Sequence, residues 1–68
     1  MGNLAEVTII RLRDGVKFDG HAWTTEKGYQ EAFWREDGLR VNLFFNSDGT
    51  QKATFMGTGR YKIEKRFS

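Results

Sequence analysis

Aromatic and basic side chains alternate along the chain from Trp34 onward, at positions that strand periodicity places on one face of a sheet. The predicted pairing puts Trp34 opposite Arg40 and Phe44 opposite Lys52. Aromatic rings can stack on unpaired bases, worth ~1–3 kcal/mol per base, while cations follow the phosphate backbone. The pattern therefore predicts a binding surface for single-stranded DNA or RNA, formed by Trp34, Arg40, Phe44, Lys52, Arg60, Lys62 and Arg66.

An ordinary solvated sheet face has a similar composition. Exposed single aromatic residues are common, and an arginine over a tryptophan can be a local cation–π pair. Glu64 interrupts the basic positions, and the net charge is only +2. From the sequence, a nucleic-acid surface and a plain solvated face both stay open.

The chain offers little for catalysis or for metal binding. His21 is the only histidine, and there is no cysteine to join it as a metal ligand. Ser47 lies in a predicted turn and Ser68 at the terminus, without a histidine nearby in the sequence to act as a base. We therefore expect no catalytic residue, no metal site and no cofactor, and a protein that is not an enzyme.

A second outward group on the first hairpin is apolar and consists of Val7, Ile9 and Trp23. Small monomers rarely expose a contiguous apolar patch, so this group predicts an interface with a protein partner or with a second copy of the chain. The alternative is a minor cluster that the chain termini or the segment 24–28 cover.

Four tripeptides with glycine in third place separate the β-prone segments. The last residue of a three-residue hairpin loop adopts the left-handed conformation, which glycine reaches at least cost, and aspartate suits the type I turn before it. We therefore expect hairpin loops at Arg13-Asp14-Gly15, Glu36-Asp37-Gly38, Ser47-Asp48-Gly49 and Gly57-Thr58-Gly59.

These loops set the strand registers, because a slip by one residue turns every side chain to the other face. The predicted partners are Ile10 with Phe18, Phe33 with Val41, Leu43 with Ala53, and Phe55 with Tyr61. Each pairing by itself gives an apolar inner face. The predicted core comprises Ile10, Leu12, Val16, Phe18, Ala22, Tyr29, Phe33, Leu39, Val41, Leu43, Phe45, Ala53, Phe55, Tyr61, Ile63 and Phe67.

The predicted fold is all-β: a single small antiparallel meander of about six short strands, curled into a barrel or half-barrel. The strands are expected near 5–12, 16–23, 29–35, 39–46, 50–56 and 60–67. One alternative is a short helix near 24–35, because Tyr29, Ala32 and Phe33 have helical spacing. Gly28 and the following Asp-Gly turn favour a strand instead.

Length and composition limit the protein class. The 68 residues allow one domain, 1–68, without cysteine or proline. No apolar run approaches the ~18 residues of a membrane-spanning helix, and the N-terminus lacks the basic-then-apolar pattern of a signal peptide. We therefore expect a cytoplasmic protein without a membrane partner.

The segment from Ile10 to Gly20 resembles the first-motif hairpin of the Sm and LSm RNA-binding family. The second motif of that family is not matched near Gly57–Ile63. Lys27-Gly28-Tyr29 and Gly59-Arg60-Tyr61 are similar to landmarks of the single-strand DNA-binding proteins of filamentous phages. Both resemblances imply a small β-barrel that binds single strands.

Two hypotheses follow. The first is a non-enzymatic β-barrel that binds single-stranded nucleic acid through its outer aromatic and basic face. The second is a protein-binding module, such as a phage- or plasmid-type inhibitor or regulatory subunit, that acts through its apolar patch or a strand edge.

Overall fold

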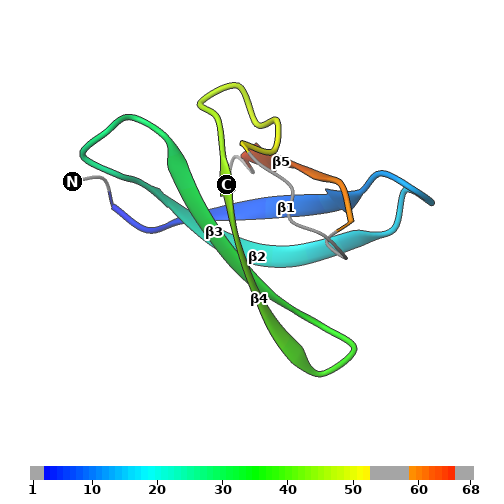
Figure 1. The fold of residues 1–68 in the computed structure, drawn as a ribbon. Coiled ribbons are helices and arrows are strands. Elements are labelled where there is room, and N and C mark those ends of the chain that lie inside the picture. Colours follow the sequence, from blue (N-terminus) through cyan, green and yellow to red (C-terminus); the bar gives the residue numbers. More distant parts are fainter. Residues whose placement is uncertain (1–2, 53–58, 66–68) are drawn as a thin grey trace.

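The computed structural model describes residues 3–52 and 59–65, which form one antiparallel sheet of five strands. The order across the sheet is β4-β3-β2-β1-β5, so consecutive strands from β1 to β4 are neighbours (Figure 1). The prediction of an all-β fold is confirmed, and the described ranges contain no helix, so the helical alternative near 24–35 is wrong. The strands are β1 (Ala5–Arg11), β2 (Lys17–Thr24), β3 (Gln30–Glu36), β4 (Leu39–Phe45) and β5 (Tyr61–Lys65).

The sheet curls, and a short segment after β4 connects the two edge strands of the sheet, β4 and β5. Gln51 forms a bridge to Phe45 on β4, and Thr50 forms a bridge to Lys62 on β5. The amide of Ile63 also donates a hydrogen bond of 2.9 Å to the carbonyl of Gly49. These bridges are the described part of the predicted strand 50–56. The rest of this predicted strand lies wholly or partly outside the described residues. The same holds for the predicted pairs Leu43–Ala53 and Phe55–Tyr61 and for the predicted loop 57–59.

The first hairpin has a longer loop than predicted. The amide of Arg11 donates to the carbonyl of Val16 at 2.8 Å, and the amide of Gly15 donates to the carbonyl of Arg11 at 2.7 Å, so four residues form the loop. Phe18 consequently lies opposite Ile9 instead of the predicted Ile10. This shift by one residue exchanges the two faces of β1.

The turn between β3 and β4 is shorter than predicted. Asp37 and Gly38 have φ angles of 52° and 80°, as the two central residues of a type I′ turn require. Glu36 therefore pairs with Leu39, and Val41 lies opposite Trp34 instead of the predicted Phe33. This second shift exchanges the two faces of β3.

The loop at 47–49 has the predicted length. The amide of Asn46 donates to the carbonyl of Thr50 at 2.7 Å, and Gly49 has a φ of 93°. A loop of the same type, which was not among the predicted hairpin loops, joins β2 to β3 at 26–28. There the amide of Thr25 donates to the carbonyl of Tyr29, and Gly28 has a φ of 91°.

The core reflects these registers. The buried cluster contains the predicted Ala22, Leu43, Phe45, Tyr61 and Ile63, with Phe18 and Val41 packed against it. Its other members are Val7, Ile9, Ala32 and Trp34. Ile10 is buried outside this cluster, and Tyr29 is half-buried. The prediction was wrong for Leu12, Val16, Phe33 and Leu39, which are exposed, while Ala53, Phe55 and Phe67 lie outside the described residues.

Glu36 connects the end of β3 to β1 and β5. Its carboxylate accepts hydrogen bonds from the Tyr61 hydroxyl at 2.9 Å and the Trp34 indole at 3.3 Å. It also forms an ion pair with Arg11 at 2.9 Å. Burial raises the pKa of Glu36, but the hydrogen bonds from Tyr61, Trp34 and Arg11 outweigh burial and leave this pKa below its usual value. The network fixes Trp34 with its indole turned inward.

Candidate functional site

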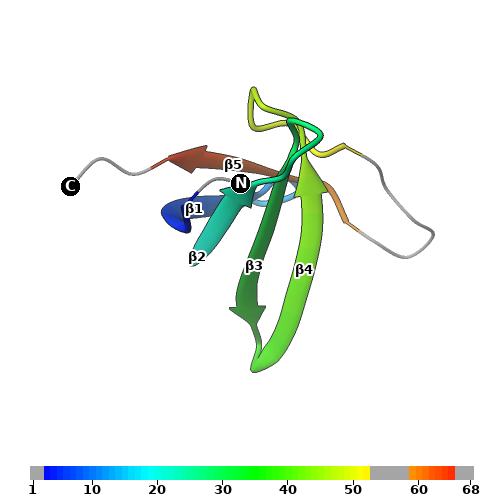
Figure 2. The same ribbon diagram turned by 90° about the vertical axis from the view of Figure 1, so that its left-hand side faces the viewer.

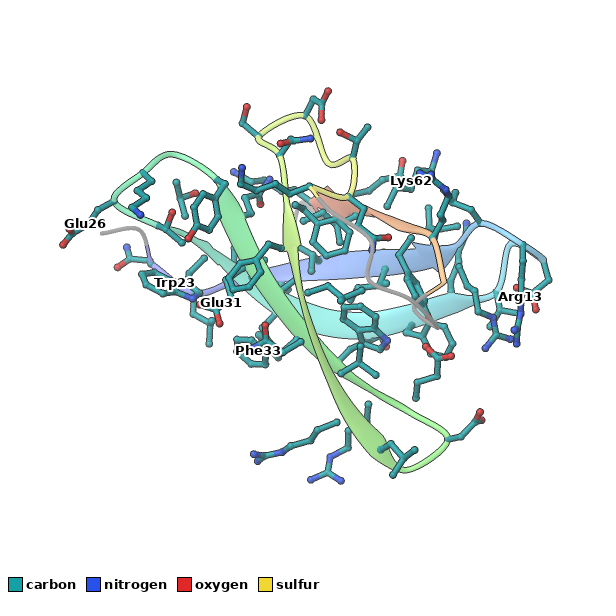
Figure 3. The ribbon with its side chains drawn as sticks, in the orientation of Figure 1. Arg13, Trp23, Glu26, Glu31, Phe33 and Lys62 are labelled. Carbon is teal, nitrogen blue, oxygen red and sulfur yellow. The ribbon has the colours of Figure 1, made fainter. Side chains whose placement is uncertain are left out.

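The face of β2, β3 and β4 that points away from the core carries a group of aromatic side chains. Ala22, Ala32 and Leu43 point inward, so the residues next to them point outward. Two rows of outward side chains cross the three strands in register. One row is Trp23, Glu31 and Phe44, and the next is His21, Phe33 and Asn42. Figure 3 shows Trp23, Glu31 and Phe33 together on one side of the sheet.

The rings on this face support one another and remain accessible. His21 stacks on Phe33 with ring centroids 6.1 Å apart, and Tyr29 meets Phe44 edge-on at 5.5 Å. Phe33 is 38% exposed and Phe44 is 40% exposed. We call His21, Trp23, Tyr29, Phe33 and Phe44 the aromatic face.

Glu31 lies at the centre of the aromatic face and orients its neighbours. Its carboxylate accepts a hydrogen bond of 3.0 Å from the Trp23 indole on β2. It accepts another of 3.0 Å from the side-chain amide of Asn42 on β4. These two bonds hold the flat Trp23 ring and the Asn42 amide in fixed positions across three strands.

Cations border the aromatic face at both ends. The ammonium of Lys52 lies 5.2 Å from the centroid of the Tyr29 ring. At the other end, Arg35 and Arg40 lie directly opposite each other in the β3–β4 ladder, and both are exposed. The ion pairs among the described residues involve neither of these two arginines.

A groove opens where β2 separates from the β3–β4 hairpin. The pairing of β2 with β3 ends at Gly20 and Trp34, and Figure 2 shows the hairpin extending beyond the other strands to its turn. Gly20 lets β2 lie close to β3 at this last pair, because a Cβ at position 20 would lie 2.7 Å from the carbonyl oxygen of Phe33. The groove has a volume of about 520 Å³, and its outward side chains are Asp19, His21, Phe33, Arg35, Arg40 and Asn42.

The described members of the predicted binding surface fall into three groups. Arg40, Phe44 and Lys52 are exposed and belong to the aromatic face or its border. Arg60 and Lys62 are exposed as well, but Lys62 lies on β5, across the molecule from Phe33 in Figure 3. The placement of Trp34 on the outer face was wrong: Trp34 is buried in the core, 4% exposed. Arg66 lies outside the described residues.

The predicted apolar patch is not present as a surface. Val7 and Ile9 are fully buried, because the four-residue first loop turns them toward Phe18 and the core. Trp23 is half-buried on the opposite face and donates to Glu31. The three residues therefore do not form one interface.

Phe33 and Arg35 point outward although neither was predicted to do so. The pattern that could have found them is Asp37-Gly38, because Asp-Gly between alternating segments is a strong indication of a two-residue type I′ turn. That turn places Phe33 and Arg35 outward and Trp34 inward.

The described residues contain no group of three histidine, cysteine or acidic side chains placed to hold a metal ion. They also form no helix that is long and apolar enough to cross a membrane. Comparison of the chain with protein-family models, with curated proteins and with solved structures finds no match. The candidate site is therefore defined by its own geometry: five aromatic side chains on one outer face, bordered by Lys52, Arg35 and Arg40.

Proposed function

We propose that this protein binds single-stranded nucleic acid, without catalysis, through the aromatic face. The observation that carries the proposal is the combination of two exposed rings, Phe33 and Phe44, with an adjacent pair of arginines. These arginines take part in none of the ion pairs among the described residues. Stacked bases and paired phosphates are the two interactions that a single strand needs from a protein surface.

The arrangement favours an unpaired strand over a duplex. The bases of a duplex are stacked on each other, so their flat faces are not accessible to Phe33 and Phe44. In a single strand the bases can turn out onto the rings, and stacking tolerates any base because every base has an aromatic face. The proposal predicts binding with little sequence preference.

The geometry gives less support to a protein-binding module. One form of that hypothesis used Val7 and Ile9 as surface residues, and both belong to the core. The other form used a strand edge, and bridges from Gln51 and Thr50 occupy part of the edges of β4 and β5. The exposed rings that remain alternate with His21, Glu31 and Asn42 and are bordered by cations, so the face is mixed and not a continuous apolar patch.

The test is titration of a labelled oligothymidine and a labelled oligouridine, followed by fluorescence anisotropy at two salt concentrations. Phe33→Ala should cost ~1–3 kcal/mol of affinity for either strand, with the salt dependence unchanged, because a stacking contact is lost and no cation is. Leu12→Ala is the matched control, since Leu12 is an exposed apolar residue in the first hairpin loop and outside the aromatic face. Absence of binding at low salt, or equal losses in the two variants, would contradict the proposal.

A further inference from the structure

We infer that the groove between β2 and the β3–β4 hairpin is a subsite for one nucleotide, in which Arg35 and Arg40 bind the phosphate while Phe33 and His21 stack on the base. The inference rests on the proposed function and deepens it. It assigns the two kinds of contact to different ends of one groove of about 520 Å³. Sites for small ligands commonly enclose roughly 300–1,000 Å³.

The phosphate position follows from the cross-strand pair. Arg35 and Arg40 are one pair removed from the turn-closing pair, Glu36 and Leu39. In a two-residue hairpin that position is of the type without ladder hydrogen bonds, where the Cα atoms lie only about 4.5 Å apart. Two guanidinium groups thus start from adjacent backbone positions at one end of the groove.

Two like charges directly opposite each other destabilise a sheet. A phosphate between the two guanidinium groups removes this repulsion and accepts charge-assisted hydrogen bonds from both. The pair therefore favours an anion in a way that one isolated arginine does not.

The base position follows from the stacked rings one row away. Phe33 lies next to Arg35 on the same strand face, two residues along β3, and is stacked with His21. Residues two apart on a strand are about 6.6 Å from each other, which separates the base contact from the phosphate contact. One nucleotide can span both.

Polar groups on the groove walls favour one direction of the nucleotide. Asp19 precedes Gly20 on β2 and so lies at the end of the groove where Arg35 follows Trp34, and the two arginines together outnumber its negative charge there. The side-chain nitrogen of Asn42 already donates to Glu31, which turns its amide to present the oxygen as an acceptor. An acceptor beside the stacked rings suits the N–H and amino donors on the edges of bases.

The test is a set of two-dimensional NMR titrations of the whole chain with three separate probes: thymidine 5′-monophosphate, thymidine, and inorganic phosphate. The monophosphate should shift the amide signals of Phe33, Arg35, Arg40 and Asn42 together. Thymidine and inorganic phosphate should each bind about tenfold more weakly or worse, because each lacks one of the two contacts.

Arg35→Gln and Arg40→Gln should each weaken binding of the monophosphate about tenfold, the amount expected for a lost charge-assisted hydrogen bond. Arg13→Gln is the control, with the same charge change at an exposed arginine across the molecule from Phe33 (Figure 3). Both test positions are exposed, and replacing one arginine relieves the repulsion of the pair, so the variants should fold. Their NMR spectra check this directly.

The possible failures are distinguishable. If oligothymidine binds but the monophosphate does not shift these signals, the subsite is wrong and the proposed function stands. The subsite is also wrong if inorganic phosphate binds as tightly as the monophosphate, or if Arg13→Gln weakens binding as much as Arg35→Gln. If oligothymidine itself does not bind at low salt, both the subsite and the proposed function are wrong.

Discussion

Gly49 and Ile63 lie in direct backbone contact across the seam of the curled sheet. The carbonyl of Gly49 accepts a 2.9 Å hydrogen bond from the Ile63 amide, and a Cβ on Gly49 would overlap the carbonyl oxygen of Ile63. Gly49 also has a φ of 93°, which L side chains rarely adopt. One residue thus terminates the 47–49 loop and brings the segment after β4 against β5.

Gly49→Ala should therefore destabilise the fold by about 3 kcal/mol or more, because left-handed strain of ~1–2 kcal/mol is added to displacement of β5. Gly28→Ala is the matched control, since Gly28 has a similar φ of 91° but open space around its Cα. It should lose only the strain, about 1 kcal/mol. Urea denaturation of both variants measures the difference, and equal losses would show that the contact with Ile63 has no role.

Glu36 should make the stability of the fold depend on acid. Its pKa in the folded protein lies below its ordinary value of 4.5, so its contribution is fully present above that value and is lost as the pH falls below it. Glu36→Gln should cost about 1–3 kcal/mol at neutral pH, because Arg11 loses its partner and Tyr61 and Trp34 lose a charged acceptor.

Denaturation of the wild type and of Glu36→Gln at neutral and acid pH tests this contribution. The difference between the two proteins should shrink as the pH falls through the range below 4.5. Part of the acid dependence should survive in Glu36→Gln, since the hydrogen bonds from Arg11 lower the pKa of Asp14 to about 2. Glu26→Gln, in the loop at 26–28, is the control. A difference that is constant with pH would contradict the role of the Glu36 charge.

Trp34 should report on the core and not on a ligand. It packs on Tyr61 with centroids 5.1 Å apart and on Phe45 at 6.4 Å. In a Trp23→Phe variant, the fluorescence of Trp34 should be blue-shifted, protected from an aqueous quencher and insensitive to oligothymidine. In a Trp34→Phe variant, the fluorescence of Trp23 should respond to the aqueous quencher and to oligothymidine. Strong quenching of Trp34 by the oligonucleotide would overturn this assignment.

Lys52 and Lys62 should differ in their effect on single-strand binding, although the sequence predicts both on the same binding surface. Lys52 lies over Tyr29 at the border of the aromatic face, whereas Lys62 lies on β5. Lys52→Ala should lower the salt slope for a single strand by ~0.7, because one phosphate contact is lost. Lys62→Ala has the same charge change and should leave the slope unchanged. Anisotropy titrations over a range of salt concentrations measure both slopes.

The sequence by itself determined the class of fold, most strand positions and one register. Alternation and glycine turns located the described strands within a few residues, and Ser47-Asp48-Gly49 gave the correct loop. The inward faces of β2 and β4 were predictable as well, because Val41, Leu43 and Phe45 alternate with Arg40, Asn42 and a single aromatic residue, Phe44. Arg40, Phe44 and Lys52 followed from that face.

The inward faces of β1 and β3 were decided only by the tertiary structure. Both faces of these strands are apolar enough for burial: Val7 and Ile9 compete with Ile10 and Leu12, and Trp34 competes with Phe33. A hydrophobic pattern cannot choose between two such faces.

Contacts from distant parts of the chain make the choice. Ile9 packs where only glycine fits at position 20, and Trp34 donates to the Glu36 carboxylate that Tyr61 and Arg11 also contact. Burying Trp34 in this network exposes Phe33 and Arg35 on the other side of β3. The candidate site is thus a consequence of which aromatic residue the core accepts, and that depends on residues brought together by the fold.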